Sequence, residues 1–361
     1  EISLGLVGSE MCIRDSYLAI PAITDAIEPT AAQQLWILDI YGFLIAGLLI
    51  TMGNVGDRIG RRRILLAGAA LFGVASVIAA FAPNAAVLIA ARALMGVGGA
   101  TLMPSSLSLI ANMFPDVRDR GRAIGVWTAA FAGGSAIGPV VGGFLLHHFW
   151  WGVVFLINVP VLAVLFVLGP RLIPEYRART SDPFDFAGVG LSMLGILPAI
   201  YAVKSLAADG VSLKAILIGV FGLLMLAVFV IHQRTVRAPL LDVRLFANPR
   251  FSAIVSVALV GMMALGGMSY LTGVYLQSVL GHDVLAAALA GLPMAVAVAV
   301  FSIGATRIAT AIGSRAAFVG SVAFAAIGNL GLLWLSTSSP IWIYLVFTSI
   351  AGIGYGIQFS L

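Results

Sequence analysis

Two ionisable residues stand inside long apolar stretches of this 361-residue chain. Asp39 interrupts the run QQLWILDIYGF, and Arg92 interrupts LIAARALMGVGG. A charge within a membrane-spanning helix costs about 2.5–3.5 kcal/mol on insertion scales, so a functional role and a partner are expected for it. Asp39 could handle a proton or a cation; alternatively, it is an outer-interface residue held by a local hydrogen bond. Arg92 could act in the same pathway, or its side chain could extend to the outer interface.

The composition decides what kind of element must position these residues. The chain is 61% hydrophobic and 10% charged, whereas soluble domains average about a quarter charged residues. Its 41 glycines follow no collagen-like repeat and suit packed membrane helices, where small residues let backbones approach closely. We therefore expect an all-α polytopic membrane protein, and this class excludes a water-soluble fold.

A helix needs about 20 apolar residues to cross the hydrocarbon core. Residues 17–23 are predicted to be the final turns of a first helix, and eleven further segments are predicted to cross. The eleven segments are 35–52, 64–82, 86–110, 123–146, 150–168, 186–206, 213–231, 251–276, 286–308, 316–335 and 341–361.

The basic residues predict the orientation of these helices. Sixteen of them fall after even-numbered helices: Arg58, Arg61, Arg62, Arg63, Arg118, Arg120, Arg122, Arg171, Arg177, Arg179, Arg234, Arg237, Arg244, Arg250, Arg307 and Arg315. The alternate gaps contain only Lys214 and, near its helix end, Lys204. Because cytoplasmic loops collect Lys and Arg, the even-numbered loops are predicted to be cytoplasmic. The same rule accounts for the net charge of +5 without a nucleic-acid partner.

One basic stretch, GNVGDRIGRRR at 53–63, contains glycines and an acid in addition to its arginines. It resembles the signature loop between helices 2 and 3 of the major facilitator superfamily. The resemblance implies a cytoplasmic latch that stabilises one of two access states, with glycines permitting close helix approach and an acid pairing with a nearby arginine or a helix N-terminus. The residues expected to act in this motif are Gly53, Gly56, Asp57, Arg58, Gly60, Arg61 and Arg62.

A second motif, GSAIGPVVGG at 134–143, resembles the helix 5 motif of proton-coupled antiporters in that superfamily. Its proline removes a backbone donor and is expected to bend the helix, and its glycine face permits close packing. Such a helix could rock and seal against leak. The residues expected to act here are Gly134, Gly138, Pro139, Gly142 and Gly143.

Three further stretches, QQLWILDIY at 33–41, WWGVVFLINVP at 150–160 and PLLDVRLFANPRF at 239–251, narrow the resemblance. Together they are similar to the fourteen-helix drug:proton antiporter branch, especially its quaternary-ammonium and methyl-viologen exporters. In helix 4 the family pattern is an arginine, two further residues, a glutamine and a glycine. This chain matches it at Arg92 and Gly96 and has Met95 in place of the glutamine. The resemblance covers about residues 17–361.

The resemblance implies two pseudo-symmetric helical bundles with two inserted helices between them. The expected boundaries are 17–175 for the N-terminal bundle, 183–233 for the inserted pair and 248–361 for a C-terminal bundle with four of six helices. Residues 1–16 contain Glu10, Arg14 and Asp15 where an apolar helix should run. We therefore expect a non-native segment there. The chain is also expected to be a fragment that lacks the last two helices and the helix 1 acid, which the resemblance implies is the main group for binding protons and cations, assisted by Asp39 and Arg92.

The implied function is a proton-coupled antiporter in the bacterial inner membrane, exporting lipophilic cationic drugs or biocides by alternating access. Its partners would be the lipid bilayer, protons and small lipophilic cations, and we expect a monomer. Asp39, Arg92, Trp36 and Tyr41 are the predicted substrate and proton pathway. These two aromatic residues, with Trp127, Tyr270 and Tyr275, could offer π faces to a cation, although packing or an interfacial belt is the alternative for each.

Two other classes of function are the alternatives to an antiporter. A metabolite symporter or uniporter would share the fold but should lack the helix 5 motif. A membrane-embedded enzyme would need clustered ionisable groups, whereas His147 and His148 are adjacent and face different sides of a helix. We therefore expect no enzymatic activity, catalytic residue, metal or cofactor, and without a G-x-x-x-x-G-K-[ST] motif ATP-driven pumping has no support.

Overall fold

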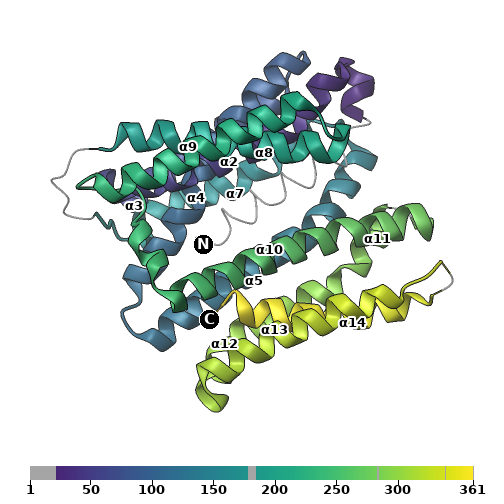
Figure 1. The fold of residues 1–361 in the computed structure, drawn as a ribbon. Coiled ribbons are helices and arrows are strands. Elements are labelled where there is room, and N and C mark those ends of the chain that lie inside the picture. Colours follow the sequence, from purple (N-terminus) through teal and green to yellow (C-terminus); the bar gives the residue numbers. More distant parts are fainter. Residues whose placement is uncertain (1–21, 178–183, 283, 338, 361) are drawn as a thin grey trace. The chain divides into compact units, whose positions relative to one another are not determined.

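The computed structural model describes residues 22–177, 184–282, 284–337 and 339–360. Within those residues the regular elements are all helices (Figure 1). They are α2 (Ala31–Ile59), α3 (Arg61–Ala80), α4 (Ala85–Met113), α5 (Val117–His148), α6 (Val153–Leu156), α7 (Asn158–Leu172), α8 (Phe186–Asp209), α9 (Leu213–Thr235), η1 (Val243–Ala247), α10 (Pro249–Val274), η2 (Tyr275–Val279), α11 (Val284–Ala290), α12 (Leu292–Ile312), α13 (Ser314–Gly331), η3 (Leu332–Trp334) and α14 (Ile341–Gln358).

This helical architecture confirms the predicted fold class. Each of the eleven predicted segments lies on a helix or on two consecutive helices. In the described part of the chain, ten spans are long and apolar enough to cross a membrane. The segment predicted at 123–146 lies within α5. Residues 1–16, predicted to be non-native, lie outside the described residues.

Several helix ends differ from the prediction. The segment 53–63 was predicted to be a loop, yet α2 continues to Ile59 and α3 begins at Arg61, with Gly60 as the only residue between them. Gly60 has φ of 122°, which L side chains rarely adopt. The predicted helix at 286–308 is divided into α11 and α12, because Pro293 at the second position of α12 has no N–H to continue α11.

The structure divides into two compact units, and the first contains residues 29–106 and 170–252. In this unit α8 and α9 lie side by side as an antiparallel hairpin, and α2 packs against both α3 and α8 (Figure 1). Because α2 contacts α8, residues near position 40 meet residues near position 200. The predicted bundle boundaries remain predictions.

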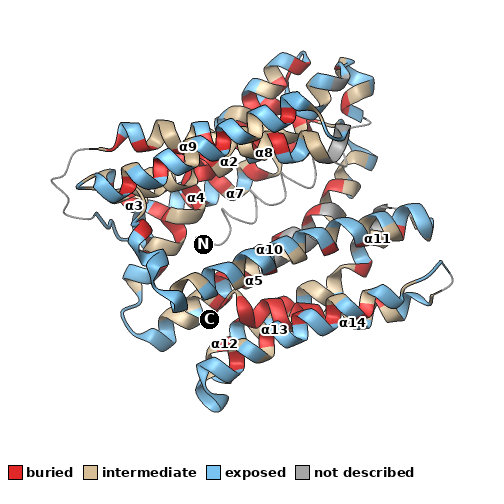
Figure 2. Cartoon of the chain, viewed as in Figure 1, coloured by how far each residue is buried: buried red, intermediate tan, exposed pale blue. Residues whose placement is uncertain are grey.

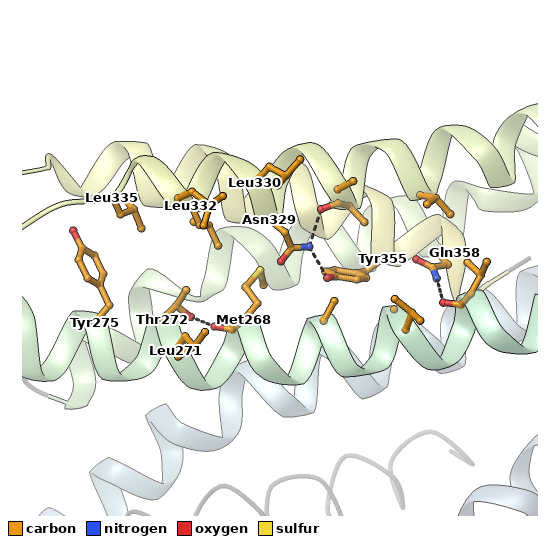
Figure 3. Close-up of a pocket in the computed structure, with 18 of the residues that line it drawn as sticks. Met268, Leu271, Thr272, Tyr275, Asn329, Leu330, Leu332, Leu335, Tyr355 and Gln358 are labelled. Atoms are coloured by element: carbon orange, nitrogen blue, oxygen red, sulfur yellow. Dashed lines mark hydrogen bonds between the residues drawn. The ribbon is translucent and has the colours of Figure 1, made fainter. Parts of the chain in front are cut away.

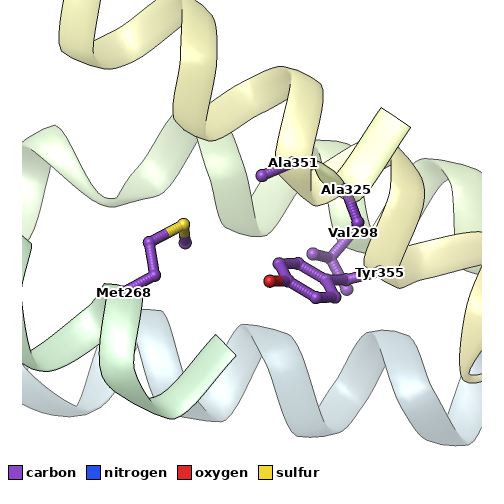
Figure 4. Close-up of a cluster of buried hydrophobic side chains, with 5 residues drawn as sticks. All are labelled: Met268, Val298, Ala325, Ala351 and Tyr355. Carbon is purple, nitrogen blue, oxygen red and sulfur yellow. The ribbon is translucent and has the colours of Figure 1, made fainter. Parts of the chain in front are cut away.

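The second unit contains residues 22–28, 107–169 and 253–360 of the described chain. Here α14 packs against both α12 and α13, and α12 packs against α5. A Cβ added at Gly356 would lie 2.6 Å from the Val298 carbonyl oxygen, so α14 and α12 are in backbone contact. Figure 4 shows the small core beside this contact, made of Met268, Val298, Ala325, Ala351 and Tyr355.

Exposed residues occur along many of these helices (Figure 2), and many of them are large and apolar. Leu223 on α9, Met263 on α10 and Trp334 on η3 are among them. In water such surfaces would favour aggregation, whereas lipid tails solvate them without cost. The chain is therefore a multi-pass membrane protein whose exposed faces suit contact with lipid.

Candidate functional site

The residues of the predicted pathway gather around a single stretch of α2. The Asp39 carboxylate forms an ion pair with the ammonium of Lys204 on α8. Both residues lie inside apolar spans, Ala32–Ile59 and Phe186–Leu206. An acid in such a span is expected to have a partner, and the structure supplies it from α8.

Sequence reasoning missed this partner. Lys204 was assigned to an outer gap, whereas the structure places it within α8, close to its C-terminal end. A signal was present, because Lys204 lies inside the segment 186–206 that the sequence itself predicted to be a helix. A lysine in an apolar span needs a counter-ion, so it could have been matched with Asp39 by charge.

Arg92 approaches the same turn of α2 from α4. Its side chain is buried, with only 1% of the residue exposed. The guanidinium donates a hydrogen bond of 3.3 Å to the Leu38 carbonyl oxygen and lies 5.7 Å from the centroid of the Tyr41 ring. This burial is the opposite of what extension to the outer interface would give. A role for Arg92 in transport stays a prediction.

The aromatic residues of α2 divide between its two faces. Tyr41 is buried towards α3, with its ring edge-on to Phe72 at 6.2 Å. Trp36 is exposed and its ring is edge-on to Phe43 at 6.2 Å. Phe43 in turn lies 5.2 Å from the Lys204 ammonium, so it belongs to the site although the sequence did not single it out.

The other three aromatic candidates lie in the second unit. Trp127 is buried and stacked on Phe131, and Tyr270 is exposed. Tyr275 donates a hydrogen bond of 2.8 Å to the Ser336 carbonyl oxygen. For Trp127, the packing alternative describes the geometry well.

The second half of the GNVGDRIGRRR motif, GDRIGRRR at 56–63, forms the junction of α2 and α3. Asp57 and Arg61 face one another across Gly60 as an (i, i+4) ion pair of 2.6 Å, with the arginine side chain buried. Arg58 donates a hydrogen bond to Asn54, and its guanidinium lies 5.3 Å from the Phe184 ring centroid. Arg58 and Arg61 therefore contact other groups of the protein, in addition to contributing to the predicted orientation of the chain in the membrane.

Glu175 is the main partner of this junction from outside the motif. Its carboxylate accepts a hydrogen bond of 3.0 Å from the backbone N–H of Arg62 and lies within 4 Å of the Arg62 and Arg63 side chains. Arg62 also donates to the carbonyl oxygens of Pro170 and Ile173. The end of α7 is thus fastened to the start of α3, a contact that the sequence did not predict.

The second motif lies in the middle of α5, which runs as one helix from Val117 to His148. Gly134, Gly138 and Gly142 are buried, as a glycine packing face requires, whereas a Cβ at Gly143 would meet open space. The side chain of Pro139 lies outside the described part, so the predicted bend stays a prediction. The contact of α5 with α12 is at Gly125, where a Cβ would lie 2.5 Å from the Ser302 carbonyl oxygen.

A cavity of about 840 Å³ lies between α10 on one side and α13, η3 and α14 on the other (Figure 3). Its wall is mostly apolar and includes Met268, Leu271 and Leu330. The polar groups are uncharged: Asn329 donates hydrogen bonds to the Ala325 carbonyl oxygen and to the Tyr355 hydroxyl, each of 2.7 Å. Gln358 donates to the Val257 carbonyl oxygen.

Asp185, one residue before the span Phe186–Leu206, forms a further polar cluster with residues of α8 and α9. It accepts hydrogen bonds from Gly188 N–H and the Gln233 amide and pairs with His232 at 2.7 Å. Burial raises the pKa of this carboxyl, but the bonds from His232, Gly188 and Gln233 together outweigh burial and leave the pKa below its ordinary value. No group of three or more His, Cys, Asp and Glu side chains that could hold a metal occurs among the described residues.

Comparison with known proteins finds similarity to drug-resistance transporters. The chain is 44% identical to the multidrug efflux pump LfrA of Mycolicibacterium smegmatis, over 87% of this chain and 62% of that protein. It is 35% identical to the methyl viologen resistance protein SmvA of Salmonella typhimurium, over 90% of this chain and 66% of that protein. The chain therefore spans about two thirds of the length of these relatives.

A solved structure shows the same fold. The proton:xylose symporter XylE, bound to 6-bromo-6-deoxy-D-glucose, superposes with a TM-score of 0.64 over 99% of this chain and 78% of that one, at 16% identity. The family model described as Major Facilitator Superfamily matches residues 5–361. With its helices, its GDRIGRRR junction and these relatives in agreement, the chain belongs to the major facilitator superfamily.

Proposed function

We propose that the protein is a proton-coupled antiporter that exports lipophilic cationic drugs or biocides across the bacterial inner membrane. The observation that carries this proposal is the 44% identity to a multidrug efflux pump. The similarity to a methyl viologen resistance protein supports a cationic substrate, because methyl viologen is an organic dication. The geometry adds an acid within an apolar span, paired with a lysine whose ammonium lies over an aromatic ring.

Coupling would follow from competition at a carboxylate. A carboxylate can be neutralised by a proton or by a cation, and binding of one disfavours the other. In an alternating-access cycle the site would exchange a cation for a proton on one side and the proton for a cation on the other. Asp39 is the acid of this chain placed for that exchange, assisted by Arg92.

The two motifs would control the conformational change. The Asp57–Arg61 pair and the Glu175 contacts would form the cytoplasmic latch, while the glycine face of α5 would pack against a moving neighbour. On this proposal the even-numbered loops are cytoplasmic, the protein acts as a monomer, and its partners are lipid, protons and the exported cation.

Everted vesicles test the proposal directly. Ethidium should accumulate in them when a proton gradient is applied, and a protonophore should abolish the accumulation. Asp57→Asn and Pro139→Ala should each abolish transport while the protein remains in the membrane. Asp119→Asn is the matched control, because Asp119 pairs with Arg122 on the exposed surface of α5. Normal dye transport by the Asp57 and Pro139 variants would refute the assignment of the motifs.

The same vesicles separate export from metabolite transport. A symporter or uniporter for a metabolite should take up a sugar and leave ethidium accumulation at the level of empty vesicles. The likeness to the xylose symporter at 16% identity concerns the fold alone. We therefore expect ethidium transport and no sugar transport.

A further inference from the structure

The ion pair between α2 and α8 has the composition of a cation site. The Lys204 ammonium contacts the Asp39 carboxylate and lies 5.2 Å from the centroid of the Phe43 ring. Phe43 is held in place by Trp36, whose ring meets it at an interplanar angle of 87°. A carboxylate and an aromatic face are the two groups that proteins use to recognise an organic ammonium.

The lysine can leave this site without moving its helix. Its side chain is 48% exposed, whereas that of Asp39 is 19% exposed. Lys204 lies two residues from the end of its apolar span at Leu206, so its flexible stem can carry the ammonium to the membrane interface. Meanwhile α8 stays anchored at its start, where Gln233 of α9 donates to Asp185.

The acid, in contrast, has no comparable freedom. The Asp39 side chain is short and lies on α2, whose neighbouring turn is fixed by the buried Arg92 bound to the Leu38 carbonyl oxygen. An unpaired carboxylate inside an apolar span would be costly, so a cation or a proton must neutralise it. Loss of Lys204 from the site therefore requires another cation or a proton to take its place.

We infer that Asp39 and Phe43 form a binding site for a lipophilic organic cation, and that Lys204 of the inserted helix pair is a tethered occupant which this cation displaces. The inference rests on the proposed export of organic cations and adds the competitor that sets their affinity. The lysine keeps Asp39 neutralised while the site holds neither substrate nor proton. When the substrate is a monocation, the exchange conserves the charge of the site.

Binding measurements on the purified protein in detergent micelles test the inference without relying on transport. The probe is tetraphenylphosphonium, a lipophilic monocation, measured by equilibrium dialysis. If Lys204 occupies the site nine tenths of the time, Lys204→Gln should lower the apparent dissociation constant about tenfold. Asp39→Asn should weaken binding, and the double variant should bind no more tightly than Asp39→Asn alone.

Two controls fix the meaning of that result. Lys204→Arg keeps a tethered cation, so the competition should persist. Its apparent dissociation constant should lie within about twofold of that of the unsubstituted protein. Lys214→Gln removes the chain's other lysine, which is exposed in the first turn of α9, and should leave binding unchanged. Weaker or unchanged binding in Lys204→Gln, or tighter binding that persists in the double variant, would overturn the inference.

A measurement on the unsubstituted protein covers the case in which the variants do not fold. Acetic anhydride should modify Lys204 faster when tetraphenylphosphonium is saturating, because the displaced ammonium is released, while Lys214 should react at an unchanged rate. Equal or slower modification of Lys204 would overturn the inference. Failure of the export proposal is read separately, as absence of ethidium transport in vesicles of the unsubstituted protein.

Discussion

At the scale of single residues, Glu175 shows how a hydrogen bond and an ion pair can be told apart. Its carboxylate accepts from the Arg62 N–H at 3.0 Å, but the arginine side-chain nitrogens are 3.7 and 3.8 Å away and the carboxylate is 26% exposed. Partly exposed ion pairs of this length contribute little. A lost acceptor for a backbone N–H costs more.

We therefore expect two substitutions of Glu175 to differ. Glu175→Gln keeps an oxygen acceptor and should lower the free energy of unfolding by less than about 1 kcal/mol. Glu175→Ala leaves the Arg62 N–H without this partner and should lower it by about 1–2 kcal/mol. Thermal unfolding in detergent measures both. Equal losses in the two variants would show that the charge, not the hydrogen bond, fastens α7 to α3.

Asp185 gives a prediction about pH. Its side chain is 4% exposed and its pKa lies below the ordinary value of 3.8, so folding favours the ionised form. This stabilisation is present above about pH 4 and is lost as the pH falls through the lowered pKa. Asp185→Asn should be less stable by about 1–2 kcal/mol at pH 7, and its deficit should shrink below pH 4.

Thermal unfolding of both proteins between pH 7 and pH 3 measures that deficit. Asp116→Asn is the control. Asp116 is exposed and caps the N-terminus of α5, where its side chain accepts hydrogen bonds from the backbone N–H groups of Arg118 and Asp119. Its pKa is also lowered, chiefly by the Asp119 N–H, but its substitution should change stability less. A deficit at Asp185 that does not depend on pH would contradict the argument.

The sequence identified Asp39 and Arg92 because each interrupts an apolar run, and this local signal is sufficient to find a charge in a span. It could not identify Phe43, which is one apolar residue among many. The partner of Asp39 lies 165 residues away on α8, and local periodicity does not specify which helices meet. Charge balance is the signal that reaches across that distance.

At the scale of elements, the backbones of α5 and α12 are in tight contact at Gly125, a glycine that the motif did not include. A Cβ at Gly125 would lie 2.5 Å from the backbone carbonyl oxygen of Ser302, and the Ser302 hydroxyl donates to the Gly125 carbonyl oxygen at 3.0 Å. A methyl group there must push α12 away, since a backbone oxygen cannot rotate aside. Overpacking of this kind costs about 1–3 kcal/mol.

Gly125→Ala should therefore lower the free energy of unfolding by about 1–3 kcal/mol, measured by thermal unfolding. The matched control is Gly133→Ala in the same helix, where an added Cβ would meet nothing within 4 Å. There the gain in helix propensity should leave stability unchanged or raise it by up to about 1 kcal/mol. The prediction fails if the two substitutions have the same effect.

Helix positions could be predicted from sequence more completely than helix contacts. A span must satisfy its backbone hydrogen bonds internally, so a run of about 20 apolar residues is enough to reveal it. Contacts between helices are harder to predict from sequence, because lipid-facing and protein-facing side chains are both apolar. On α9, for example, Leu223 is exposed and Phe229 is buried. The single-residue junction at Gly60 was missed because four arginines suggested a loop.

At the scale of the whole molecule, the asymmetry of charge is the property from which orientation follows. Sixteen arginines are predicted on one side, and the structure adds reasons for some of them to stay there. Arg61 is paired with Asp57, and Arg62 is bound to Glu175. Moving these groups across the bilayer would require breaking their contacts as well as dehydrating the charges.

Cysteine accessibility in cells and in everted vesicles tests that orientation. In a background with Cys12 replaced by serine, Arg63→Cys, Arg120→Cys and Arg237→Cys should react with a membrane-impermeant maleimide only in everted vesicles, because the positive-inside rule places all three in the cytoplasm. His148→Cys and Lys214→Cys should react only in intact cells. If Arg63→Cys and Arg120→Cys reacted from opposite sides, an odd number of crossings would separate them. The predicted threading would then be wrong, and the cytoplasmic latch proposed at the α2–α3 junction would lose its basis.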